Sequence, residues 1–350
     1  MTRAALAFTV TSLVPVPFLV AGALMGGVWA WLALLYMTAF AYCLDDLIAA
    51  ASDDENCEFP AHNVLSVTLA LAQLGLLGVV VAALSGQTGL PAGERLALFV
   101  ATGLFMGQVG NSNAHELIHR AQRPLFALGK WVYISLLFGH HTSAHPLVHH
   151  RFVASDRDPS SARIGESYYR FARRAWIGSF REGLKAETAR RTTTNRRDLH
   201  PYAVYIGGAA GFLVLSVLIG GLAGLVAYVA LCAFAQSQLL VSDYVQHYGL
   251  RRKVMPDGKP EPVGPQHSWN APHWYTRHMM LNAPRHSDHH AHPARPFPDL
   301  RLPGADEVPT LPRSLPTMAF LALFPKVWKR VMDPRVSRWM TPGTDRMAAE

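Results

Sequence analysis

The sequence has few charged residues and few cysteines. Only 16% of its 350 residues are charged, whereas a soluble domain has about a quarter, and half of the residues are hydrophobic. This balance argues against a soluble protein. Cys43, Cys57 and Cys232 show no CxxC spacing, which excludes a disulfide framework, a zinc ribbon or an iron–sulfur site built by this chain alone.

Long stretches without charge indicate membrane spans. Residues 4–44 contain no Asp, Glu, Lys or Arg, and one crossing needs only about 20 residues, so this stretch predicts two spans that turn at Gly26 and Gly27. Residues 201–242 repeat the pattern around Gly220 and Gly221. The apolar segment 125–138 is short and carries Lys130, which predicts a re-entrant or interfacial piece. We expect six transmembrane helices, at about residues 4–25, 28–44, 63–85, 96–114, 203–220 and 222–244.

The distribution of basic residues predicts the orientation. Of the 32 Lys and Arg, 15 lie within 120–197 and 15 within 251–346. By the positive-inside rule, segments 115–200 and 245–350 are cytoplasmic, together with both termini. We therefore expect one all-α, multi-pass integral membrane domain over residues 1–350. The net charge of +8 then reflects topology, and nucleic acid is not an expected partner.

Histidine is unusually abundant, with 17 residues, of which 14 fall within 115–150 and 267–292. His115 and His119 have the HExxH spacing, which places two imidazoles on one helix face. A loose metal-binding tract would be contiguous, whereas the spaced groups occur in four parts of the chain. Under the six-span topology they all emerge at the cytoplasmic face. The nine grouped histidines are His115, His119, His145, His149, His150, His247, His286, His289 and His290.

The other eight histidines are expected to have ordinary interfacial or structural roles. They are His62, His140, His141, His200, His267, His273, His278 and His292.

Nine imidazoles exceed the needs of one metal ion. A catalytic zinc takes three protein ligands, whereas two six-coordinate ions with open positions can use all nine. Imidazole suits iron, copper, zinc and nickel, so the ligand type alone does not select the metal. The apolar setting favours an oxygen-activating diiron centre, because unactivated C–H bonds of lipid-dissolved substrates need such chemistry. The sequence thus predicts a histidine-rich diiron cap on the cytoplasmic side.

The histidine motifs together resemble a known family. HELIHR at 115–120, His145 with His149 and His150, DYVQHYG at 243–249 and PRHSDHHA at 284–291 are similar to the membrane alkane 1-monooxygenases. Xylene monooxygenase hydroxylase components and, more distantly, membrane fatty-acid desaturases share the pattern. The resemblance runs from the acidic loop after the second span to about Pro316. It implies a six-helix enzyme with two non-haem iron ions, held by the nine grouped histidines listed above.

Three residues depart from the pattern of this family. Ala144 and Val148 replace the usual Glu and Gly around the middle histidines, and Gln246 replaces the Glu before His247. These positions are expected to alter contacts behind the ligands, which tune metal sites. Glu116 and Asp288 are expected to accept hydrogen bonds from imidazole N–H groups. A solvated or helix-capping role is the alternative for both acids.

The resemblance implies hydroxylation of a terminal alkyl or methyl C–H bond, such as alkane to 1-alkanol, with O2 as co-substrate. The hydrophobic substrate would enter from the membrane lipid. Because one oxygen atom leaves as water, two electrons must arrive from a rubredoxin or ferredoxin with its NAD(P)H-dependent reductase. Trp29, Trp31, Tyr36 and Phe40 are candidates to limit the chain length of the substrate, although packing against lipid or neighbouring helices is the favoured interpretation.

Other functions remain open at this point. A membrane fatty-acyl or lipid desaturase or hydroxylase uses similar iron chemistry and differs in its product. A membrane zinc protease would use His115, Glu116 and His119 and leave the other groups without a role. A membrane metal-binding or transport protein belongs to another class, and it would place ligands within the spans.

Overall fold

The computed structural model describes residues 2–48, 59–304 and 306–340. Within these ranges the chain is helical, and the β-structure consists of isolated bridges. Cys57 lies outside them, whereas Cys43 and Cys232 are free thiols. The all-helical expectation is confirmed for the described part of the chain.

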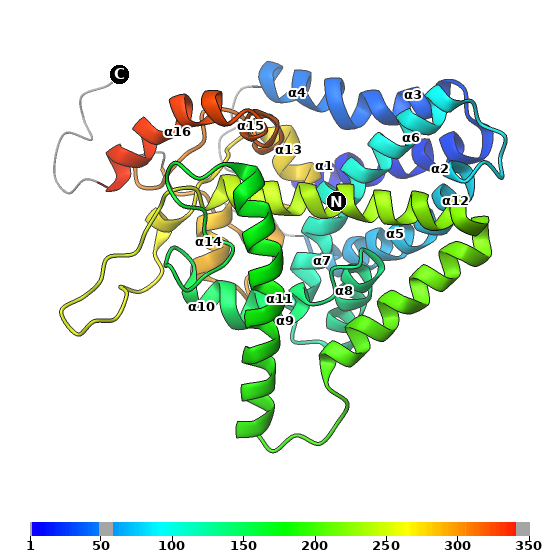
Figure 1. Cartoon of the computed structure of the whole chain (residues 1–350). Coiled ribbons are helices and arrows are strands. Elements are labelled where there is room, and N and C mark those ends of the chain that lie inside the picture. Colours follow the sequence, from blue (N-terminus) through cyan, green and yellow to red (C-terminus); the bar gives the residue numbers. More distant parts are fainter. Residues whose placement is uncertain (1, 49–58, 305, 341–350) are drawn as a thin grey trace.

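The apolar stretches form paired helices. A turn at Gly26 and Gly27 separates the helix that ends at Met25 from the helix that begins at Val28. A break at Gly220 and Gly221 divides the longest helix into two arms (Figure 1). These helices are α1 (Arg3–Leu13), α2 (Pro15–Met25), α3 (Val28–Leu35), the π-helical η1 (Tyr36–Phe40), α4 (Ala41–Leu47), α5 (His62–Leu84), α6 (Ala92–Phe105), the π-helical η2 (Met106–Gly110), α7 (Asn111–Ile118) and α12 (Pro201–Gln246).

The turns of the three pairs lie together at one end of the molecule, on the right in Figure 1. The Gly27 N–H donates to Oε2 of Glu94 at 2.7 Å, which joins the first turn to the start of α6. A Cβ at Gly220 would collide with Ser85, so the break in α12 packs against the end of α5. Three helical hairpins are therefore aligned, with their turns at one end.

Four helices are long and apolar enough to cross a membrane: Arg3–Met25, Val28–Leu47, His62–Leu84 and Pro201–Gln246. The last has 46 residues, and its two arms correspond to two of the expected spans. The expected span 96–114 is helical but is not among these four. Several apolar helices long enough to span a membrane are thus present in the described chain.

Small residues let α6 and η2 approach α12 closely. A Cβ at Gly103 would collide with the Phe234 ring, and one at Gly107 would collide with Gln238. Glycines at such spacing allow close helix contact in membranes. This contact fixes the direction of α7, which continues from η2 and carries the first histidines.

Short helices and loops form a cap at the other end. The predicted interfacial segment forms α8 (Arg123–Ser135), which packs on α7. Helix α11, green in Figure 1, projects from the cap. The cap elements are α9 (His141–Ala144), the π-helical η3 (His145–His149), α10 (His150–Phe152), α11 (Tyr168–Thr193), α13 (Trp274–Met279), α14 (His286–Ala291), α15 (Leu315–Ala322) and α16 (Pro325–Met340).

Candidate metal centre

The nine grouped histidines come together in two adjacent clusters. Within each cluster the candidate ligand nitrogens lie within 4.8 Å of one another. Cluster 1 comprises His115, His119, His145, His150 and His289, and cluster 2 comprises His149, His247, His286 and His290.

Two pairs of consecutive histidines join the clusters. Neighbouring residues on a helix point in different directions, so each pair supplies one imidazole to each cluster. His149 belongs to cluster 2 and His150 to cluster 1, while His289 belongs to cluster 1 and His290 to cluster 2. The rings of His150 and His290 are 4.7 Å apart across the boundary. The paired histidines thus place two candidate metal positions side by side.

A π-helical turn assigns the middle histidines to their clusters. In an α-helix, residues four apart share a face, which would place His145 beside His149. The turn η3 (His145–His149) closes hydrogen bonds five residues apart instead, and it contains Pro146, which has no N–H. Nε2 of His150 lies 2.9 Å from Nε2 of His145. His145 and His150 therefore share cluster 1, and His149 is directed to cluster 2.

The spacing of the ring nitrogens fits metal coordination. Nε2 of His115 is 2.7 Å from that of His145, and Nε2 of His247 is 2.9 Å from that of His286. Two nitrogens that bind one ion at about 2.1 Å and at a right angle lie about 3.0 Å apart. Nε2 of His119 and of His149 is buried with no hydrogen-bond partner among the described residues. A bound metal ion would provide a partner for both nitrogens.

Burial favours the neutral form of the imidazoles, which is the form that binds metals. It lowers the pKa of His145, His289 and His290 well below the usual value, and neighbouring imidazoles add to the effect. Burial lowers the pKa of His119 to about 4, with contributions from His149 and Arg120. Burial therefore favours uncharged nitrogen donors at these four histidines near neutral pH.

His149 has a carboxylate partner, Asp158, that the sequence reasoning missed. Nδ1 of His149 lies 2.9 Å from Oδ2 of Asp158, which is 2% exposed. Although burial lowers the pKa of His149, the carboxylate outweighs it and the pKa is raised. The Ser161 hydroxyl and the Ser160 N–H donate to the same carboxylate. This arrangement orients the ring so that Nε2 faces cluster 2. An acid nine residues after a histidine is not a recognisable motif.

Glu116, Asp288 and Gln246 bond mainly to other parts of the cap. Glu116 accepts from Arg120, one turn further along, and from the Phe297 N–H at 3.1 Å. Gln246 donates to the Ala283 carbonyl at 3.1 Å. Asp288 binds Arg295, the Arg301 N–H and the ring of His292, which belongs to neither cluster. Glu116 thus has an arginine and a backbone N–H as its described partners, whereas Asp288 has an imidazole partner, His292, that lies outside the clusters.

The position of α14 depends on buried polar contacts. The Ser287 N–H donates to Oδ1 of Asn270 at 3.0 Å, and the Asn270 amide donates to the Ser287 hydroxyl at 2.6 Å. The Ser287 hydroxyl also donates to the Ser268 carbonyl. These bonds fix the helix that presents three of the nine histidines.

The remaining eight histidines belong to neither cluster. Several have other partners: His278 bonds the Trp274 carbonyl, His140 lies 3.2 Å from the Ser179 hydroxyl, and His267 faces Glu261. Of the aromatic candidates, Trp31 and Phe40 are exposed on the helix surface, and Tyr36 is buried and donates to the Thr11 carbonyl.

Comparison with known proteins identifies the family. The fatty acid desaturase family model matches residues 95–322, a range that contains all nine histidines. The chain belongs to the fatty acid desaturase family. Within it, the motif resemblance to alkane monooxygenases is confirmed by relatives at about 30% identity.

The relatives cover different shares of the chain. Alkane 1-monooxygenase 1 of Alcanivorax borkumensis is 34% identical over 250 residues, which are 70% of this chain and 61% of that protein. Alkane 1-monooxygenase 2 of Pseudomonas aeruginosa is 30% identical over 323 residues, 88% of this chain and 84% of that protein. The xylene/toluene monooxygenase hydroxylase component of Pseudomonas putida is 28% identical over 251 residues. The chain spans about six tenths of the length of the first of these relatives.

Proposed function

We propose that this protein is a non-haem diiron monooxygenase that hydroxylates a terminal alkyl or methyl C–H bond of a hydrophobic substrate. The two adjacent clusters of five and four histidines carry the proposal. The relatives named alkane 1-monooxygenase support it. The overall reaction converts R–H, O2, two electrons and two protons to R–OH and water.

Each cluster would hold one iron ion. His115, His119, His145, His150 and His289 would bind the first, and His149, His247, His286 and His290 the second. When bound, the pair of iron ions supplies the activation of O2 that C–H hydroxylation needs. The protein contributes neutral, oriented imidazoles and a buried setting that limits access of water.

We further propose that residues 1–350 form one domain with six crossings of the bacterial inner membrane. The three hairpin turns lie at one end, and the histidine cap lies at the other. Most basic residues lie in the cap segments, which supports a cytoplasmic metal site with both termini on the same side. Substrate would then reach the clusters from the lipid rather than from water.

The two electrons would come from a separate rubredoxin or ferredoxin with its reductase. A surface hollow of about 450 Å³ on α11 is lined by Arg170, Arg173, Arg174 and Arg181. Arg174 donates to the Pro159 carbonyl at 2.9 Å, and the next residue back is Asp158, the partner of His149. An acidic carrier attracted to these arginines would therefore be separated from cluster 2 by one loop.

Purified protein in detergent tests this function. We expect two iron ions per chain and conversion of octane, hexadecane or xylene to the alcohol with a rubredoxin and its reductase. A His289→Ala variant should lose turnover, whereas His200→Ala, at a histidine outside both clusters, should keep it.

Three results would contradict the proposal: protein without bound iron, full activity in His289→Ala, or an alkene as the product. The last outcome would favour a desaturase, which the matching family model makes the closest alternative.

A further inference from the structure

A cavity and a groove adjoin at the start of α12. The cavity, of about 540 Å³, lies between α8, α9, α11 and α12, and its lining includes Arg120, Lys130, Arg190 and Arg196. The groove, of about 530 Å³, runs along the first arm of α12 and is lined by apolar residues and glycines. Leu199 and Val204 line both. The two spaces therefore adjoin at Leu199 and Val204, and together they offer a basic end and an apolar end.

Two of the four cations in the cavity are free to bind an anion. Arg120 pairs with Glu116, and Arg190 pairs with Glu187 at 2.7 Å. Lys130 and Arg196 form no ion pair within the described ranges. Asp198, which also lines the cavity, is paired with Arg191 at 3.3 Å. The lining of the basic end thus carries four cations and two carboxylates, Glu187 and Asp198.

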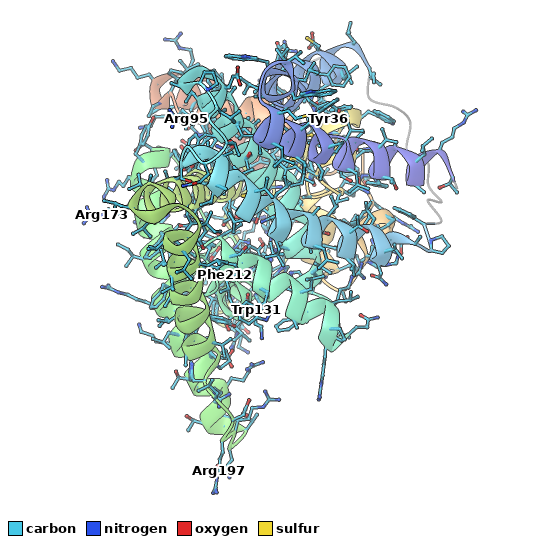
Figure 2. All side chains as sticks on the ribbon, turned by 90° about the vertical axis from the view of Figure 1, so that its right-hand side faces the viewer. Tyr36, Arg95, Trp131, Arg173, Arg197 and Phe212 are labelled. Carbon is cyan, nitrogen blue, oxygen red and sulfur yellow. The ribbon has the colours of Figure 1, made fainter. Side chains whose placement is uncertain are left out.

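The groove offers a shallow, open apolar surface to an alkyl chain. Gly207 and Gly211 have open space where a Cβ would be, so their backbone forms the floor. Trp131 and Phe212, whose rings are 6.5 Å apart and lie near each other in Figure 2, form a wall. Leu215 is 47% exposed along the same surface. A chain lying here would cover apolar surface on a helix that is a candidate membrane span.

A lipid at the membrane surface has a charged headgroup followed by apolar acyl chains, and the basic end and the apolar end of this site follow the same order. Cationic side chains and tryptophan are common where a span meets the headgroup layer, and basic pockets between helices bind anionic headgroups. Lys130 and Trp131 are consecutive on α8, so one side chain reaches the basic end and the other lines the apolar end.

We propose that this site binds an anionic phospholipid of the surrounding bilayer. Its phosphate lies between Lys130 and Arg196, and one acyl chain follows the groove past Gly207 and Gly211. The inference rests on the membrane placement proposed above and does not depend on iron chemistry.

The bound lipid would also brace the cap. In the cavity, Ser143 of α9 donates to Glu187 of α11 at 3.2 Å and lies 2.8 Å from the Tyr205 hydroxyl of α12. Helix α9 leads directly into His145. An anionic headgroup between Lys130 of α8 and Arg196, just after the end of α11, would link these two parts of the cap beside α9.

Native mass spectrometry of the full chain, released from nanodiscs of mixed phosphatidylglycerol and phosphatidylcholine, tests the proposal. We expect preferential retention of phosphatidylglycerol. Each cation contributes about fivefold in affinity, so Lys130→Gln with Arg196→Gln should largely remove the preference. Lys326→Gln with Arg330→Gln, an equal charge change on α16, is the matched control and should keep it. Gly211→Leu fills the groove and should reduce retention without changing charge.

Three outcomes would overturn the proposal: equal retention of the two lipids by the wild type, unchanged preference in the Lys130 and Arg196 variant, or equal loss in the α16 control. Competition by inorganic phosphate alone would indicate an anion site without a chain, and competition by oleate alone would indicate a fatty acid site. Both would contradict a phospholipid. Circular dichroism checks that the variants fold, and retention by chelated protein separates this test from the test of the iron centre.

Discussion

At the scale of single residues, carboxylates and backbone groups decide which imidazole nitrogens face the clusters. Asp158 fixes the ring of His149, and burial keeps the other imidazoles uncharged. Glu116 and Asp288 act elsewhere, since they bind arginines and backbone N–H groups that hold the loops around α14. Of these three carboxylates, Asp158 is therefore the one that bonds a clustered histidine in the described structure.

Asp158→Asn should weaken the second metal position. The substitution leaves a neutral amide oxygen in place of the charged acceptor of the His149 N–H, and such changes behind a ligand typically lower metal affinity or activity by about 10- to 100-fold. Iron content and turnover measure the effect. Asp156→Asn, in the same loop with a side chain 82% exposed, is the control and should match the wild type. Equal iron content and activity in both variants would argue against a role for Asp158.

His278 should make the fold sensitive to acid. It is buried between Phe8 and Trp274, and burial, with a smaller effect of Arg277, lowers its pKa to about 3. In the unfolded chain the pKa is about 6.5, so the unfolded state binds more protons between these values and stability falls as pH drops from about 6.5 towards 3.

The comparison of His278→Gln with the wild type measures this effect. The variant, which does not titrate, should lose about 1–2 kcal/mol less stability between pH 7 and pH 5. Thermal unfolding at the two pH values gives the difference, and His200→Gln, at a histidine outside this site, serves as the control. A parallel loss in all three proteins would show that other groups cause the acid sensitivity.

At the scale of helices, the sequence predicted where helices and their breaks lie better than it predicted the hydrogen-bonding pattern within a helix. The uncharged stretches and the Gly26–Gly27 and Gly220–Gly221 breaks were correct, because charge and glycine act directly on membrane insertion and backbone conformation. The π-turn over 145–149 was not predicted, since periodicity arguments assume one helical winding. The nine grouped histidines could be found from spacing, yet their division into five and four depends on that turn.

Gly221 should be required for the break in α12. Its φ is +60° and its ψ is −147°, a positive-φ conformation essentially confined to glycine, where a residue with a Cβ costs about 1–3 kcal/mol. Gly221→Ala should therefore lower the thermal unfolding temperature. Gly75→Ala, at a helical position of α5 with open space around it, is the control and should be neutral or slightly stabilising. A variant of Gly221 as stable as the control would mean that the break tolerates a side chain.

At the scale of the whole molecule, the fold separates an apolar hairpin end from a polar metal-binding end. Five of the six expected spans lie within helices that are apolar enough by themselves. The sixth, 96–114, leads directly into the histidines and contains the polar residues Gln108, Asn111, Ser112 and Asn113. Its glycines place it in close contact with α12, which is a candidate span. A count of apolar residues therefore identifies this helix as a membrane span less clearly than the other five.

The separation of the two ends predicts which side of the membrane each loop occupies. Gln87, in the turn between α5 and α6, should face the periplasm, and Lys259, in the basic cap segment, should face the cytoplasm. In a variant whose three native cysteines are replaced, Gln87→Cys should react with a membrane-impermeant maleimide in intact cells. Lys259→Cys should react only after permeabilisation. Labelling of both positions in intact cells would rule out this topology. The reverse pattern would place the histidine clusters outside, away from cytoplasmic electron carriers.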